Sequence, residues 1–199
     1  MEHSAVPAGI RDAVRKSAGA RFYKAALQVN PFAYTKRHAK NTPYKTEDEY
    51  NAAIVDACVK HGVEVVGITD HFRIATARSL ADALAMYGVH VFLGFEASSS
   101  EGVHLLCLFP DSTPDQELAR AIGACGLGDH DADSPQSDKT CEQLLQLIPK
   151  MGGIAIAAHA CSAGGLLLTL KGQARARVWT KRRGDLLDHS MLQCAHTEQ

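Results

Sequence analysis

The chain has 199 residues, a formal net charge of −1 and 46% hydrophobic residues. A chain of this length can bury a substantial core, and the composition is that of an ordinary globular domain. The nearly neutral charge excludes a global field that would attract nucleic acid or an anionic membrane, and the apolar runs are too short to span a bilayer.

The cysteines indicate a reducing compartment. Six stand at positions 58, 107, 125, 141, 161 and 194, with no CxxC pair and no secretory segment at the start of the chain. Cys58 falls in a helical pattern and Cys107 in an apolar strand pattern, so both are interpreted as buried side chains. We therefore expect a cytoplasmic protein without a membrane partner.

The chain up to position 45 contains one predicted strand. Residues 1–20 include Pro and Gly without a hydrophobic period and are interpreted as a leader. A strand is predicted over 22–29 and stops at Asn30-Pro31, because the residue before a proline is driven away from helix. Residues 31–45 are polar and basic and are predicted to form a loop.

Thr46 begins a regular alternation of helices and strands. With Glu49 it makes a capping box, and Gly62 ends the helix that follows. The segment 64–69 is apolar on both faces, as expected of a central parallel strand. Further strands are predicted over 90–95, 103–109 and 153–158, and further helices over 79–87, 114–124 and 139–151. This alternation predicts an α/β fold with a parallel sheet or barrel.

The pattern fades after Leu170. Residues 171–183 carry six basic side chains and no acidic one, so 171–199 is interpreted as a basic tail without a regular element. The folded domain is therefore expected to span residues 21–170.

Chemically competent side chains stand at the ends of several predicted strands. Asp70 and His71 follow the strand over 64–69, and Glu96 follows the strand over 90–95. His159 follows the strand over 153–158, while His104 stands at the front of the strand over 103–109. Parallel α/β folds place their sites at the carboxyl ends of strands. Histidines and carboxylates gathered there suit a divalent metal, which can lower the pKa of a bound water and hold a phosphoryl oxygen.

Each of these residues also has a structural interpretation. A histidine at a strand end is often only hydrogen-bonded, Asp70 could cap the following turn, and Glu96 could pair with a Lys or Arg. An unrelated α/β domain with structural histidines therefore stays open as an alternative.

Four segments, in order, resemble successive motifs of the PHP (polymerase and histidinol phosphatase) superfamily. They are GITDHF (67–72), GFEAS (94–98), GVHLLCLF (102–109) and GGIAIAAHA (152–160). The opening segment GARFYKAALQVNPFAY (19–34) is similar to the start of the TrlF-like branch, in which a PHP domain precedes an AAA-like ATPase. The resemblance covers roughly residues 19–180.

The resemblance implies a distorted (β/α)7 barrel that holds up to three divalent ions, commonly Zn, Mn, Fe or Mg. It implies hydrolysis of a phosphate ester through a metal-activated water. Asp70, His71 and Glu96 then correspond to the catalytic set, with His71 and His159 as ligands and Glu96 as a bridging carboxylate. His104 matches a further histidine of the metal site. The implied partners are a phosphorylated small molecule or a nucleic-acid end, and an ATPase domain or subunit.

The sequence departs from the family at both ends of the motif series. Gln28 and Asn30 stand where the first motif has histidines, so they are the corresponding metal-site positions, with amide oxygens that suit harder cations better than zinc. The last motif, an Asp-x-His, is missing, and Asp188-His189 is adjacent rather than spaced. We therefore expect a barrel that is incomplete at its C-terminus, from a fragment or a shifted reading frame. The alternative function is a catalytically degenerate PHP domain that binds a nucleotide, nucleic acid or an ATPase partner.

Overall fold

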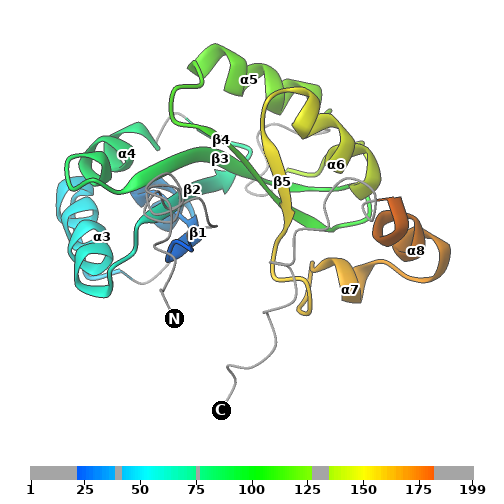
Figure 1. Cartoon of the computed structure of the whole chain (residues 1–199), viewed down its shortest axis with the longest axis horizontal. Coiled ribbons are helices and arrows are strands. Elements are labelled where there is room, and N and C mark those ends of the chain that lie inside the picture. Colours follow the sequence, from blue (N-terminus) through cyan, green and yellow to red (C-terminus); the bar gives the residue numbers. More distant parts are fainter. Residues whose placement is uncertain (1–21, 39–41, 75–76, 127–134, 182–199) are drawn as a thin grey trace, which may run out of the picture.

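The computed structural model describes residues 22–38, 42–74, 77–126 and 135–181 (Figure 1). The predicted leader, the Asp188-His189 pair and the end of the tail lie outside these residues. The described chain forms a curled, mixed sheet of five strands in the order β1-β2-β3-β4-β5. The strands are β1 (Ala25–Val29), β2 (Val65–His71), β3 (His90–Ser98), β4 (His104–Pro110) and β5 (Ile154–Ala157). The expected seven-stranded barrel stays a prediction.

One strand runs against the expected direction. β1, β2 and β3 are parallel, as predicted, but β4 is antiparallel to both of its neighbours, so the sheet is mixed. Only residues 99–103 join β3 to β4, whereas a parallel crossover needs about a dozen residues or more. The start of β4 therefore lies beside the end of β3, where His104 pairs with Ser98.

Four helices lie along the outer side of the curled sheet (Figure 1). They are α3 (Glu47–His61), α4 (Arg78–Ala85), α5 (Asp115–Ala124) and α6 (Cys141–Lys150). The capping box at α3 is confirmed, because Thr46 accepts from the Glu49 backbone N–H while the Glu49 side chain accepts from the Thr46 backbone. Gly62 ends the helix in a left-handed conformation, with φ of 61°.

Three helices form where no helix was predicted. α2 (Phe32–Arg37) replaces part of the expected loop, and proline as the residue before its first turn is compatible with a helix start. α7 (Leu166–Thr169) and α8 (Gly172–Lys181) follow β5, so the beginning of the expected tail is helical. α8 has few apolar residues, and its Ala174 and buried Val178 pack on the core. Tertiary contact therefore stabilises a segment with little amphipathic pattern.

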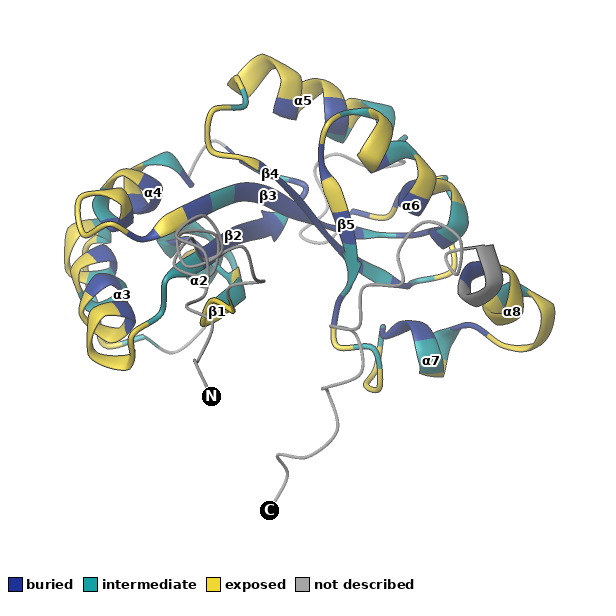
Figure 2. Cartoon of the chain, in the orientation of Figure 1, coloured by how far each residue is buried: buried dark blue, intermediate teal, exposed yellow. Residues whose placement is uncertain are grey.

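The two faces of the sheet pack differently. The main core lies on the side of the helices, as the buried inner faces of Figure 2 show, and contains the stacked rings of Phe72, Phe95 and Phe109. A smaller cluster around Leu106 and Leu108 lies on the other, concave face. Because side chains alternate along a strand, Glu96 and His104 point to this concave face.

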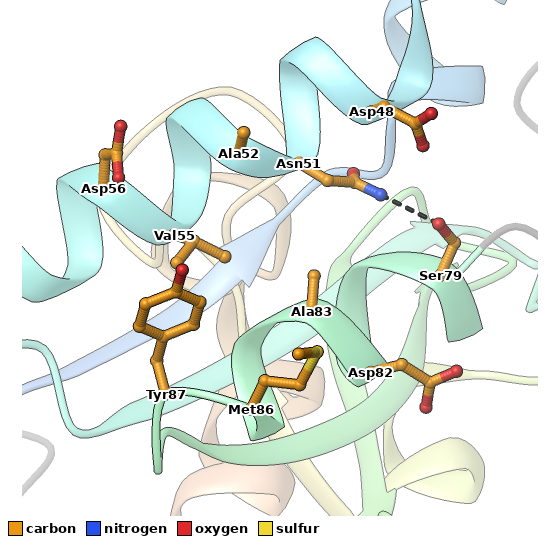
Figure 3. Close-up of a pocket in the computed structure, with 10 residues that line it drawn as sticks. All are labelled: Asp48, Asn51, Ala52, Val55, Asp56, Ser79, Asp82, Ala83, Met86 and Tyr87. Atoms are coloured by element: carbon orange, nitrogen blue, oxygen red, sulfur yellow. Dashed lines mark hydrogen bonds between the residues drawn. The ribbon is translucent and has the colours of Figure 1, made fainter.

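A groove of about 400 Å³ lies between α3 and α4, away from the strand ends (Figure 3). Asp48, Asp56 and Asp82 line it, and the Asn51 amide donates to the Ser79 hydroxyl across it at 2.9 Å. Within the described residues these three carboxylates do not converge into a set of metal ligands. The groove belongs to the outer helical layer, and it is separate from the chemistry at the strand ends.

None of the helices in the described ranges combines the length and apolar character needed to cross a membrane. The five cysteines of those ranges are thiols, four of them buried, and Cys161 is exposed.

The thiols should differ sharply in reactivity. Burial raises the pKa of Cys125 to about 12, so we expect it to stay protonated and unlabelled by iodoacetamide between about pH 7 and 10. Exposed Cys161 should be alkylated in native protein at the same time. Peptide mapping by mass spectrometry measures both sites. Labelling of Cys125 at the rate of Cys161, without denaturant, would contradict the burial of α5's end.

Candidate metal centre

Three side chains from different elements converge on the concave face of the sheet. Glu96 comes from β3, His104 from the start of β4 and His159 from the loop after β5. Each offers one ligand atom, and the three atoms lie within 4.8 Å of one another. Oε1 of Glu96 is 2.8 Å from Nδ1 of His104 and 3.7 Å from Nε2 of His159.

These residues fit a divalent cation. Two ligands that each lie about 2.1 Å from one ion are themselves roughly 3 to 3.5 Å apart, which is close to the observed separations. Nδ1 of His104 is buried, yet no hydrogen bond of acceptable geometry reaches it. This nitrogen lies 2.8 Å from Oε1 of Glu96 without the alignment of a hydrogen bond, and coordination of a cation would satisfy both atoms. One carboxylate and two imidazoles are a common donor set for zinc and related metals.

The charges at the site favour a cation. Burial raises the pKa of Glu96, but its contacts with His104, His71 and Gln28 outweigh this effect and lower the pKa below its usual value. Contact with the Glu96 carboxylate in turn raises the pKa of His104, against the effect of burial. Glu96 is therefore an ionised carboxylate held out of water, with a side chain only 5% exposed.

The loop after β5 fixes the backbone at both histidines. The His104 backbone N–H donates to the Gly164 carbonyl at 2.8 Å, and the Ala158 N–H donates to the His104 carbonyl at 3.0 Å. A Cβ on Gly165 would lie 2.2 Å from the His159 carbonyl oxygen, so only glycine allows this approach. His159 itself has φ of 29°, a strained conformation of the kind that clusters at functional sites.

His71 and Asp70 lie beside these three side chains. In the β2–β3 register His71 is opposite Glu96, and burial lowers the pKa of His71, although Glu96 acts to raise it. Asp70 is buried, makes a bidentate ion pair with Arg37, and accepts the His71 backbone N–H at 2.7 Å. Asp70 is thus held by Arg37, and its catalytic role stays a prediction. That His71 binds the metal stays a prediction.

Sequence reasoning missed the contribution of α2. The Tyr34 and His38 rings each lie 5.5 Å from the His71 ring, and Nε2 of His38 is buried without a hydrogen-bond partner among the described residues. Burial raises the pKa of Tyr34, and nearby Glu96 raises it further. The i, i+4 spacing of Tyr34 and His38 was the available signal, since it places both on one face of a helix.

The two amides of the first motif take different places. The Gln28 side-chain N–H donates to Oε2 of Glu96 at 2.8 Å. The Asn30 side-chain N–H donates to the Thr69 carbonyl at 2.8 Å and so links the end of β1 to β2. Gln28 is part of the site, whereas the amide nitrogen of Asn30 is directed to the backbone.

Arg37→Met should destabilise the fold through Asp70. The substitution leaves a carboxylate that is 1% exposed without its cation, and we expect a loss of about 2 kcal/mol, less than for a fully buried pair because Arg37 is partly exposed. Urea denaturation measures the loss. Lys139→Met breaks the exposed pair with Asp138 and should change stability by no more than about 0.5 kcal/mol. Equal effects of the two substitutions would contradict the burial of Asp70.

The sequence matches no protein-family model and no curated protein. Among solved structures, the chain is similar to a candidate metal-dependent phosphoesterase from Bifidobacterium adolescentis ATCC 15703, with a TM-score of 0.46 and 13% sequence identity. The similarity covers 82% of this chain and 84% of that chain. A likeness of this degree carries no inference about activity, which has to be argued from the residues of the site.

Proposed function

We propose that the chain is a PHP-type phosphoesterase domain that hydrolyses a phosphate ester with a divalent cation held by Glu96, His104 and His159. The observation that supports this most is the buried, ionised Glu96, whose carboxylate converges with ligand atoms of His104 and His159. A buried carboxylate requires a cation or a proton beside it to balance its charge, and a divalent ion held by these residues would supply it.

A divalent ion bound there would lower the pKa of a water molecule and neutralise charge on a phosphoryl group. The side chains around the ion would accept a proton and hold the ligands in place. His71 supplies an imidazole whose pKa is lowered by burial, so it is neutral near pH 7 and able to accept a proton. Glu96 and His104 hold each other's orientation through the 2.8 Å contact.

Arg37 adds positive charge at the same edge of the sheet. One of its nitrogens pairs with both oxygens of Asp70, while its Nε is buried without a partner among the described residues. The Arg37 side chain is 21% exposed, and guanidinium groups bind phosphate well. We propose a phosphorylated small molecule or a nucleic-acid end as the substrate, and an ATPase domain or subunit as a partner.

One observation favours the alternative of a non-catalytic binding domain. Gln28 occupies an oxygen of Glu96 that would otherwise be available to a cation, and neither it nor Asn30 supplies an imidazole. Such a domain would keep a metal or phosphate site but lack turnover.

Phosphatase assays distinguish the phosphoesterase from the non-catalytic binding domain. Protein loaded with Mn²⁺, Zn²⁺, Co²⁺ or Mg²⁺ is tested on p-nitrophenyl phosphate and bis-p-nitrophenyl phosphate, beside His104→Ala and the exposed control His90→Ala. We expect metal-dependent hydrolysis of one of these esters, at least about 100-fold slower in His104→Ala and unchanged in His90→Ala. Folded, metal-loaded protein that hydrolyses neither ester would overturn the enzymatic proposal and favour the binding domain.

A further inference from the structure

The two oxygens of Glu96 have different surroundings. Oε1 faces the ligand atoms of His104 and His159, at 2.8 and 3.7 Å. Oε2 accepts the hydrogen bond of the Gln28 amide at 2.8 Å. The carboxylate is buried, so water does not compete strongly for either oxygen.

The orientation of the Gln28 amide follows from chemistry. A carboxylate is only an acceptor, so the amide must present its N–H₂ to Oε2, because the reverse orientation would set two acceptor oxygens against each other. The N–H therefore directs partial positive charge at Oε2. A second cation on that oxygen would have to displace this donor.

The other amide of the first motif is directed to the backbone. The Asn30 side-chain N–H₂ donates to the Thr69 carbonyl at 2.8 Å, and the main-chain carbonyl of Asn30 accepts from the Tyr50 hydroxyl at 2.9 Å. Across the described ranges, Glu96, His104 and His159 form the one group of three His, Cys, Asp or Glu side chains with converging ligand atoms. The geometry thus offers three protein ligands for one ion and a hydrogen-bond donor where a second ion would need a ligand.

We infer that Gln28 is a positioning residue that restricts Glu96 to monodentate coordination through Oε1, so that this centre holds a single divalent ion. The inference rests on the proposed metal site and specifies its composition. Gln28 acts through Glu96: its hydrogen bond orients the carboxylate toward the two imidazoles and keeps Oε2 out of coordination.

The test counts ions. Metal-free wild type, Gln28→Glu, Gln28→Leu and Asn30→Asp are titrated with Co²⁺, and native mass spectrometry counts ions per folded chain while isothermal titration gives the affinity. Wild type should bind one ion. Gln28→Glu replaces the donor with a second carboxylate beside Oε2 and should bind two. Asn30→Asp makes the same chemical change two residues along the chain and should still bind one, since its side chain faces Thr69.

Gln28→Leu removes the donor without adding a ligand. We expect one ion bound about 10- to 100-fold more weakly, as for other groups that orient a ligand, together with a changed Co²⁺ absorption spectrum. This variant keeps the inference testable if Gln28→Glu does not fold.

The outcomes separate this inference from the proposed function. Two or more ions on wild type, or a folded Gln28→Glu that binds one, would overturn the role of Gln28 and leave the metal site standing. An unchanged Co²⁺ affinity and absorption spectrum in Gln28→Leu would also overturn the role of Gln28 and leave the metal site standing. A wild type that binds no Co²⁺ would overturn the metal site and the inference together.

Discussion

Replacing His104 by alanine is expected to lower the affinity for Zn²⁺ or Co²⁺ by at least about 100-fold, since loss of a ligand should exceed the 10- to 100-fold effect of losing a group that only orients one. The substitution removes the ring whose buried Nδ1 has no hydrogen-bond partner and lies 2.8 Å from Oε1 of Glu96. Isothermal titration of metal-free protein measures the change.

His90→Ala is the matched control for that substitution. His90 lies at the start of β3 and is exposed, far along the strand from Glu96 at the other end. Its replacement should leave the affinity within about twofold of wild type. Equal loss of affinity in the two variants would mean that the imidazoles bind metal adventitiously, and the convergence of Glu96, His104 and His159 would then have no function.

Gly94→Ala should destabilise the whole fold, by about 3 kcal/mol or more. A Cβ at this position would lie 2.1 Å from the Cys107 carbonyl oxygen on β4, a backbone atom that cannot move without separating the two strands. For a chain of this size the melting temperature should fall by roughly 6 to 12 °C. Because Glu96 is two residues along β3, metal affinity should fall as well.

Gly123→Ala provides the control with the same chemical change. Gly123 lies in α5, is exposed, and a Cβ there meets nothing within 4 Å. Alanine favours helix over glycine, so we expect a gain of about 0.5 to 1 kcal/mol. A melting temperature of Gly94→Ala within about 1 °C of wild type would contradict the packing of β3 against β4.

Local signals in the sequence predicted most of the elements. The capping box of Thr46 and Glu49 and the left-handed Gly62 determine the ends of α3 through contacts within a few residues. The apolar run of β2 reports burial on both faces, and the structure confirms it. These features depend on near neighbours, which a single sequence contains.

The missed features depend on distant parts of the chain. α8 gains stability from packing two apolar side chains on the core, and α2 lies against β2 through Arg37 and Tyr34. The direction of β4 could have been inferred from the short link over 99–103. That direction matters for the site: in a wholly parallel sheet, His104 would lie at the opposite end from Glu96.

The candidate site was predicted as a set of residues, but its connections were not. Glu96, His104 and His159 converge as expected, while the hydrogen bond from Gln28 to Glu96 and the ion pair between Arg37 and Asp70 join residues more than 30 positions apart. The resemblance placed Gln28 at a metal-site position, and only the three-dimensional structure shows that its N–H faces the carboxylate.

The metal content of the wild-type protein tests this account most directly. Protein purified without chelator is desalted and analysed by inductively coupled plasma and native mass spectrometry, before and after incubation with Co²⁺. We expect about one divalent ion per folded chain, lost in Glu96→Gln and His104→Ala and retained in His90→Ala. Folded wild-type protein that carries no ion and binds none when Co²⁺ is supplied would contradict the metal centre formed by Glu96, His104 and His159.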